Sequence, residues 1–190
     1  MDTPTREALR DRLLDADRAQ ALPVTGRHDA AVLVPLYADA RRGLVVVLTE
    51  RRADLRRHAG EVAFPGGRRD PGEDLVTTAL REAEEEIGLG REHVDVVGAL
   101  APVGTLVTGF RVYPLVGVIE AGHTWVPERG EVARVLELPL AGLRDGRRFR
   151  PLVRQGMPVP TVHYVLDGHL VWGATARMLH QLLGRLAPLL

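Results

Sequence analysis

Residues 67–89 constrain this chain more than any other part of its sequence. They place three carboxylates, Glu82, Glu85 and Glu86, at spacings of i, i+3 and i+4. If the segment is helical, the three acids lie on one face, where they repel one another unless a cation lies between them. Hard oxygen ligands suit Mg²⁺ or Mn²⁺, and in enzymes these ions usually act on phosphates. The segment therefore predicts a helix that binds a divalent metal ion.

The predicted helix also has a face suited to the protein core. At about 100° per residue, its apolar side chains fall within one arc beside the three acids. Gly88 suits the position just after a helix end. We therefore expect a helix over residues 74–87. Its apolar face consists of Leu75, Val76, Ala79, Leu80, Ala83 and Ile87.

Missing residue types exclude several kinds of catalysis. The chain has no Cys, Ser, Lys or Asn, so all 25 of its basic residues are Arg. Without Cys there is no thiolate nucleophile and no Cys-ligated zinc. Without Ser and Lys there is no Ser-His-Asp triad, no Schiff base and no Lys-containing phosphate loop. The remaining side chains favour metal-assisted hydrolysis.

Length and charge are typical of one globular domain, which we expect to span residues 1–190. The formal net charge is zero, which gives no reason to expect a nucleic-acid or membrane partner. The sequence has no apolar run long enough for a membrane span, and its start is charged and amphipathic. We therefore expect a cytoplasmic protein with a small-molecule substrate. Its oligomeric state stays open.

Hydrophobic periodicity predicts strands mixed with three helices, and so a layered α/β domain. We expect helices over residues 4–20, 74–87 and 174–186. Strands are expected at 30–37, 43–49, 94–100, 110–118 and 132–138, with a hairpin of 162–164 and 170–172 turned by Asp167 and Gly168. Residues 64–67 and 70–72 are expected to form turns.

The chain resembles the Nudix hydrolases through residues 67–89. Gly67 is followed by five residues, Glu73, seven residues and then Arg81-Glu82-Ala83, Glu85-Glu86 and Gly88-Leu89. Every fixed position of the Nudix signature is met, with Ala83 where a bulkier aliphatic residue is more usual. The resemblance implies an α/β/α sandwich around a mixed sheet. It also implies hydrolysis of a nucleoside diphosphate linked to another moiety, by water attack on phosphorus.

The resemblance also implies roles for individual residues. Glu82, Glu85 and Glu86 would bind Mg²⁺ or Mn²⁺, with the Gly67 carbonyl as a further ligand. Arg81 and Glu73 would pair and orient these carboxylates. The expected catalytic set is then Glu73, Arg81 and Glu85.

A second motif, over residues 47–67, is similar to that of the coenzyme A pyrophosphatase branch of the family. The matches are Leu48, Thr49, Arg51, Arg56, Gly60 and residues 64–67, and residues 172–176 also resemble this branch. Val47 and Arg52 depart from the motif, and we expect Arg52 to be a bystander. Coenzyme A carries a 3′-phosphate besides its pyrophosphate, and Arg51, Arg56 and Arg57 could meet that charge, although each could equally well pair with a nearby acid.

Several alternatives stay open at this point. Glu120, Glu128 and Glu131 are each candidates for a general base in a loop, and the sequence does not choose among them. The substrate could instead be ADP-ribose or a dinucleotide. A non-catalytic nucleotide sensor and an RNA-decapping enzyme are weaker hypotheses.

Overall fold

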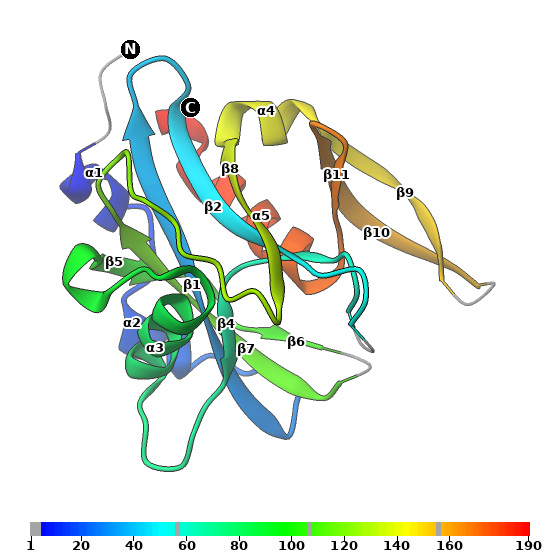
Figure 1. Ribbon diagram of the computed structural model, residues 1–190, viewed down its shortest axis with the longest axis horizontal. Helices are drawn as coiled ribbons and strands as arrows, with labels where there is room; N and C mark the ends of the chain where they lie inside the picture. Colours follow the sequence, from blue (N-terminus) through cyan, green and yellow to red (C-terminus); the bar gives the residue numbers. More distant parts are fainter. Residues whose placement is uncertain (1–4, 56–57, 106–107, 155–156) are drawn as a thin grey trace.

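A mixed β-sheet forms the centre of the molecule (Figure 1). The structure is a computed structural model that describes residues 5–55, 58–105, 108–154 and 157–190. Strand β1 runs parallel to β7, and the other pairs of this sheet are antiparallel. The order is β3-β2-β1-β7-β5, with β8 paired to β2, β4 to β1 and β6 to β7. The strands are β1 (His28–Asp39), β2 (Gly43–Arg51), β3 (Val62–Ala63), β4 (Gly66–Arg68), β5 (Asp95–Ala99), β6 (Val103–Gly104), β7 (Phe110–Val118) and β8 (Val132–Pro139).

Both faces of this sheet are covered. Strand β1 can be buried on both sides because its residues are apolar along most of its length. Its odd-numbered residues Ala31 and Leu33 pack with α3 (Leu75–Ile87). Its even-numbered residues Val32 and Val34 belong to a second cluster that includes α5 (Gly173–Leu186). This layered arrangement is the expected α/β/α architecture.

Helix α3 has the boundaries that its sequence predicts. Its N-cap is Asp74, whose Oδ1 accepts a hydrogen bond of 2.7 Å from the Thr77 amide. It ends at Gly88, which adopts the left-handed conformation with φ of 71°. The helix therefore begins and ends at residues whose local chemistry suits those positions.

A second, smaller sheet in the C-terminal part has the order β11-β10-β9 and projects from the body (Figure 1). Its predicted hairpin is confirmed, and both turn residues, Asp167 and Gly168, have positive φ. Its strands are β9 (Arg147–Arg154), β10 (Met157–Leu166) and β11 (His169–Val171), and the short helix α4 (Leu140–Asp145) precedes them. In the described parts of the chain, no helix has the length and apolar character needed to span a bilayer.

The single helix predicted over residues 4–20 is wrong. The structure has two short helices there, α1 (Arg6–Arg10) and α2 (Ala16–Gln20). Between them, Leu14 forms a bridge with Ala99, exchanging backbone hydrogen bonds of 3.0 and 2.8 Å. Asp15 then caps α2 by accepting hydrogen bonds from its first amides. The chain thus forms backbone hydrogen bonds with the sheet at Leu14 instead of the helical hydrogen bonds that one continuous helix would have.

Three further elements, β4, β9 and α4, are not predicted by the sequence patterns. Residues 66–68 form strand β4 rather than part of a turn, because Gly66 lets the backbone approach β1 closely. A Cβ at Gly66 would lie 2.4 Å from the Ala31 carbonyl oxygen. Strand β9 was missed because its sequence is rich in Arg and contains proline, without apolar alternation. Helix α4 is only six residues long.

The C-terminal end of α3 gives a test of this packing. A Cβ at Gly88 would lie 2.8 Å from the Val126 Cβ, whereas a Cβ at Gly122, with φ of 82°, would meet nothing within 4 Å. We expect Gly88→Ala to lower the free energy of unfolding by about 2 kcal/mol and Gly122→Ala by about 1 kcal/mol. Urea denaturation measures both. Equal losses would show that only backbone strain matters at Gly88.

Candidate functional site

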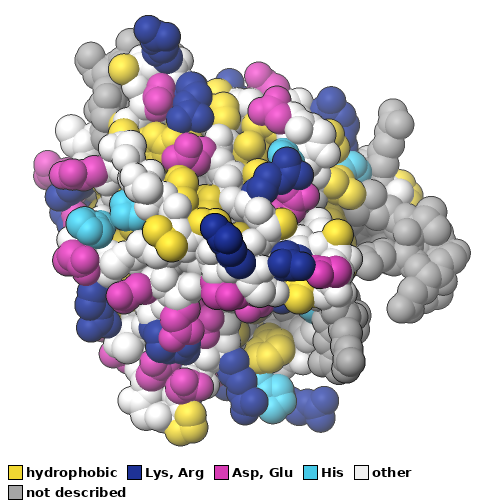
Figure 2. All heavy atoms as spheres, in the orientation of Figure 1, with side chains coloured by type: hydrophobic (Ala, Val, Ile, Leu, Met, Phe, Trp, Pro, Cys, Tyr) yellow, Lys and Arg dark blue, Asp and Glu magenta, His cyan; other side chains and the backbone are white. Residues whose placement is uncertain are grey.

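Strand β4 and helix α3 bring Gly67 and Glu82 together. A Cβ at Gly67 would lie 2.4 Å from Glu82 Oε1 and 2.5 Å from Oε2. Only glycine therefore allows the Glu82 carboxylate to lie directly against this backbone. Figure 2 shows acidic side chains gathered over the part of the surface where Figure 1 places α3, with basic side chains among them.

The Arg81 guanidinium is the centre of the site's hydrogen bonding. Its Nε donates to Glu73 Oε1 at 2.9 Å, and its Nη2 donates to Glu73 Oε2 at 3.2 Å. Its Nη1 donates to Glu82 Oε1 at 2.9 Å and to Glu85 Oε2 at 3.2 Å. One cation thus orients three carboxylates, and the expected Arg81–Glu73 pair is present.

Glu73 is held as a carboxylate by several donors. Besides Arg81, the Thr78 hydroxyl donates to its Oε2 at 2.8 Å and the Asp70 amide donates at 3.4 Å. These donors, Arg81 first, lower the pKa of Glu73 to about 2. Thr78 is fully buried and was not expected to take part. No sequence pattern separates it from the neighbouring Thr77, and only the fold shows that its hydroxyl faces Glu73.

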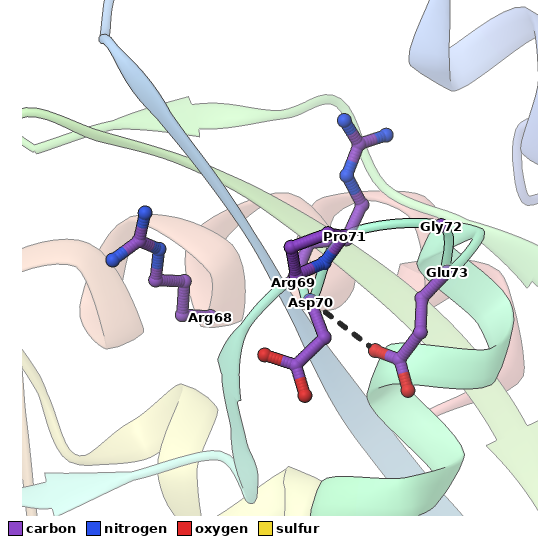
Figure 3. A pocket seen from close by; sticks show the side chains of 6 residues that line it. All are labelled: Arg68, Arg69, Asp70, Pro71, Gly72 and Glu73. Carbon is purple, nitrogen blue, oxygen red and sulfur yellow. Dashed lines mark hydrogen bonds between the residues drawn. The ribbon is translucent and has the colours of Figure 1, made fainter.

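The loop from β4 to α3 forms an open hollow beside this cluster (Figure 3). The carboxylates of Asp70 and Glu73 point to one side of it, and the guanidinium groups of Arg68 and Arg69 point away from them. The Arg69 guanidinium instead pairs with Asp29 at 3.2 Å. Glu82 and Glu86 do not line the hollow, so it belongs to the support of the site and not to the predicted metal-binding face.

Glu86 is the most deeply buried acid of the motif, with 8% of its surface exposed. Burial first, then the charges of Glu131 and Glu82, raise the pKa of Glu86 to about 8, although Arg51 and the Gly66 amide oppose the shift. Burial also raises the pKa of Glu82, despite the hydrogen bond from Arg81. Two acids are thus held where their charge is costly in the absence of a cation.

Among the three loop acids, the structure brings Glu131 to the site. Its charge acts on both Glu82 and Glu86, and its Oε1 accepts a hydrogen bond from Nη1 of Arg51. Glu128 instead accepts from the Gly130 amide, and Glu120 is exposed. The sequence could name Glu131 but could not select it, because its position depends on the path of a long connection.

That connection, residues 120–131, is fastened to the end of α3. The Val126 amide donates to the Ile87 carbonyl at 3.0 Å, and the Glu128 amide donates to the Glu86 carbonyl at 2.9 Å. These bonds satisfy carbonyl groups that a helix end leaves without partners. The backbone of Glu86 therefore fixes the loop that carries Glu131.

The three predicted metal ligands are not equivalent in the structure. Glu82 and Glu86 turn inward, but the Glu85 side chain is 59% exposed and bonds to Arg81. Within the described ranges, no three Asp, Glu or His side chains already form a group that could hold a metal ion. Arg51 lies beside the site, whereas Arg56 and Arg57 fall outside the described residues.

The residues nevertheless fit a hard divalent cation. Glu82, Glu85 and Glu86 offer only oxygen ligands, as Mg²⁺ and Mn²⁺ prefer. Burial and neighbouring acids raise the pKa values of both inward-facing acids even though Arg81 and Arg51 lie near them, so a further cation would stabilise their charged forms. The absent side chain of Gly67 leaves its backbone open to Glu82.

Arg52 bonds to Asp54 and to the backbone of the loop that carries Glu131. Its Nη1 donates to the Arg129 carbonyl at 2.7 Å, and its amide donates to the Glu131 carbonyl at 3.0 Å. Asp54 holds the guanidinium with hydrogen bonds of 2.8 and 2.6 Å. These bonds hold Arg52 against a nearby acid and the loop next to Glu131, and the expectation that it takes no part in substrate binding stays a prediction.

Known proteins resemble this chain in sequence. Residues 26–148 match the family model described as NUDIX domain. A Citrobacter koseri protein named "Uncharacterized Nudix hydrolase NudL" is 44% identical over 160 residues, covering 82% of this chain and 81% of that protein. A Pectobacterium atrosepticum protein of the same name is 42% identical over 163 residues, covering 84% and 83%.

Solved structures resemble it in fold. The NUDIX domain of Shewanella oneidensis NrtR, crystallised with ADP ribose, has a TM-score of 0.54 at 18% identity, over 88% of this chain and 92% of that one. A C. elegans Ap4A hydrolase has a TM-score of 0.51 at 21% identity, over 60% and 82%. At these identities the likeness concerns the fold alone.

The Glu73 cluster predicts a dependence of stability on acid. The pKa of Glu73 in the folded protein is about 2, below its ordinary value of 4.5. Its contribution is therefore present above about pH 4.5 and is lost as the pH falls toward 2. We expect Glu73→Gln to be less stable than the parent at pH 7 and to lack this part of the acid dependence. Denaturation at a series of pH values tests this, and an unchanged acid profile would contradict it.

The Glu86 carboxylate predicts a pH dependence of stability opposite to that of Glu73. Because its folded pKa is raised to about 8, the acid opposes folding at high pH and has no such effect below its ordinary pKa. In a chelator, we expect Glu86→Gln to be more stable than the parent by roughly 2 kcal/mol at pH 9 and equally stable near pH 4. The matched change Glu84→Gln, at an exposed position of the same helix, should alter stability at neither pH. A destabilised Glu86→Gln at pH 9 would contradict the burial argument.

Proposed function

The chain belongs to the Nudix hydrolase family, and we propose that it is a metal-dependent pyrophosphohydrolase of coenzyme A. Cleavage would yield adenosine 3′,5′-bisphosphate and 4′-phosphopantetheine. The observation that carries the proposal is the Arg81-ordered carboxylate face of α3, with Arg51 at its edge. The named relatives leave the substrate open, since they are called uncharacterized.

The residues would divide the chemistry as follows. Glu82, Glu85 and Glu86, with the Gly67 carbonyl, would hold Mg²⁺ or Mn²⁺. Such an ion, when bound, neutralises phosphate charge and positions the attacking water. Arg81 would keep the carboxylates oriented, and Glu73 would keep Arg81 in place through its paired hydrogen bonds. We assign Glu73 and Arg81 to orientation, and Glu85 to the metal and to catalysis.

Arginines support coenzyme A as the substrate. Arg51 contributes a cation beside the carboxylate face, and Arg56 and Arg57 follow it in the sequence. Guanidinium groups can bind phosphate oxygens in pairs. A substrate with a 3′-phosphate in addition to its pyrophosphate would use more of these cations than ADP-ribose.

Two alternatives remain in competition with this proposal. ADP-ribose is supported by the NrtR domain, which has a similar fold and whose crystals contain ADP ribose. A nucleotide sensor would bind without turnover. The ordered acid cluster favours an enzyme, because a sensor has no need of several metal ligands.

A substrate panel tests the proposal directly. With Mg²⁺ or Mn²⁺ in ¹⁸O water, we expect coenzyme A to be hydrolysed faster than dephospho-coenzyme A, ADP-ribose or NADH, with the label found in one phosphate product by mass spectrometry. Glu86→Gln should abolish turnover, and Glu84→Gln should retain it. Faster cleavage of dephospho-coenzyme A or ADP-ribose would show that the 3′-phosphate argument is wrong.

The arginines after Arg51 can be tested separately. We expect the double variant Arg56→Gln/Arg57→Gln to raise KM for coenzyme A about tenfold, because it loses charged hydrogen bonds to the 3′-phosphate. KM for dephospho-coenzyme A should change much less. Arg41→Gln, at an exposed turn between β1 and β2, removes a charge elsewhere and should leave both values unchanged. Equal increases for the two substrates would contradict recognition of the 3′-phosphate.

A further inference from the structure

Arg51 and Glu131 form an ion pair at the edge of the acid cluster. The Arg51 guanidinium bonds to Glu131 through Nη1. The side chains of Arg51 and Glu131 are 25% and 43% exposed, so water or a ligand can reach the pair. Within the described residues, Arg51 Nε is buried and has no hydrogen-bond partner. Arg51 therefore has donor capacity that Glu131 does not use.

Backbone geometry directs both side chains to this place. Strand β2 pairs Glu50 with Arg134 and Arg51 with Val132, so the register shifts between Glu50 and Arg51. A bulge of this kind bends a strand and redirects the side chains next to it. The Glu131 amide also donates to the Glu128 carbonyl at 3.1 Å, which keeps Glu131 at the start of β8.

Neighbouring residues hold the Glu131 loop from two sides. Arg52 bonds to the carbonyls of Arg129 and Glu131, and the Glu86 carbonyl bonds to the Glu128 amide. The loop is thus fixed, while the carboxylate at its end remains partly exposed. Movement of the Arg51–Glu131 pair therefore requires only side-chain rotation.

The negative charge of Glu131 is repelled by the neighbouring acids. It lies close enough to Glu82 and Glu86 for its negative charge to act on both. The only favourable partner found for its carboxylate in the described residues is Arg51. A phosphate arriving at the acid cluster with its metal ion would need the same guanidinium.

We propose that Glu131 and the substrate's pyrophosphate compete for Arg51, so that the Arg51–Glu131 pair closes the free site and opens when the substrate binds. The inference rests on the proposed function in that it takes Arg51 as a phosphate-binding residue. Glu131 then holds Arg51 in the free site, and a ligand must displace the Glu131 carboxylate before its phosphate can bind Arg51.

Binding of ADP with Mg²⁺, measured by calorimetry, tests this competition. ADP carries the pyrophosphate without the rest of coenzyme A, so the result does not depend on whether coenzyme A is the substrate. We expect Glu131→Gln to tighten ADP binding about threefold, as expected for loss of a partly exposed ion pair. Arg51→Gln should weaken ADP binding about tenfold.

Two further variants separate competition from simple repulsion. Glu131→Asp keeps the charge but shortens the side chain by one methylene, so it should also tighten binding. In an Arg51→Gln background, Glu131→Gln should have no effect, since the pair no longer exists. Glu120→Gln removes an exposed acid from the same connection and should leave ADP affinity unchanged. Thermal unfolding of each variant confirms that it folds.

Three other outcomes of the ADP measurements would overturn the proposal. Tightening by Glu131→Gln that persists without Arg51 would indicate repulsion between Glu131 and the ligand. Unchanged affinity with a large loss of turnover would make Glu131 a participant in catalysis instead. Weaker ADP binding in both Glu131 variants would place Glu131 among the groups that hold the ligand or its metal ion. If coenzyme A is not cleaved but ADP behaves as expected, the proposed substrate fails and the competition stands.

Discussion

The site depends on one guanidinium. Arg81 contacts Glu73, Glu82 and Glu85 at hydrogen-bonding distances, so one positive charge stabilises acids that would otherwise repel one another. Arginine suits this position because its planar group offers several donors in fixed directions, whereas an ammonium group is a compact point charge. Glu73 binds two of these donors and prevents Arg81 from turning toward solvent.

Glu86, which Arg81 does not contact, lies where a bound cation would stabilise its charge. Glu86 is almost fully buried, and it receives only partial compensation from Arg51 and the Gly66 amide. A sequence selected for stability alone would not keep a carboxylate there. The buried charge of Glu86 lowers the stability of the fold, as is common for residues of functional sites.

Local sequence signals predicted much of this structure. Strands β1 and β2 could be predicted because apolar runs buried on both faces are unmistakable, and α3 because Asp74 and Gly88 mark its ends. Local sequence patterns did not predict the structure where a contact with a residue distant in the sequence determines the local conformation. Leu14 leaves the helical path to pair with Ala99, and the side-chain bonds of Arg52 and Thr78 depend on residues that the fold brings near them. For the same reason the sequence predicted three acids on one helix face but could not show that Glu85 turns outward or that Glu131 joins the cluster from a loop.

Glu86 also joins two parts of the molecule, since its side chain faces the acid cluster and its carbonyl holds the Glu128 amide. The Val126 amide is held in the same way by the Ile87 carbonyl. The chain from Val126 to Glu131 is therefore positioned by the end of α3, and its length determines where the Glu131 carboxylate lies. Among related sequences, the number of residues between Val126 and Glu131 should therefore vary less than their identities at positions 127–130.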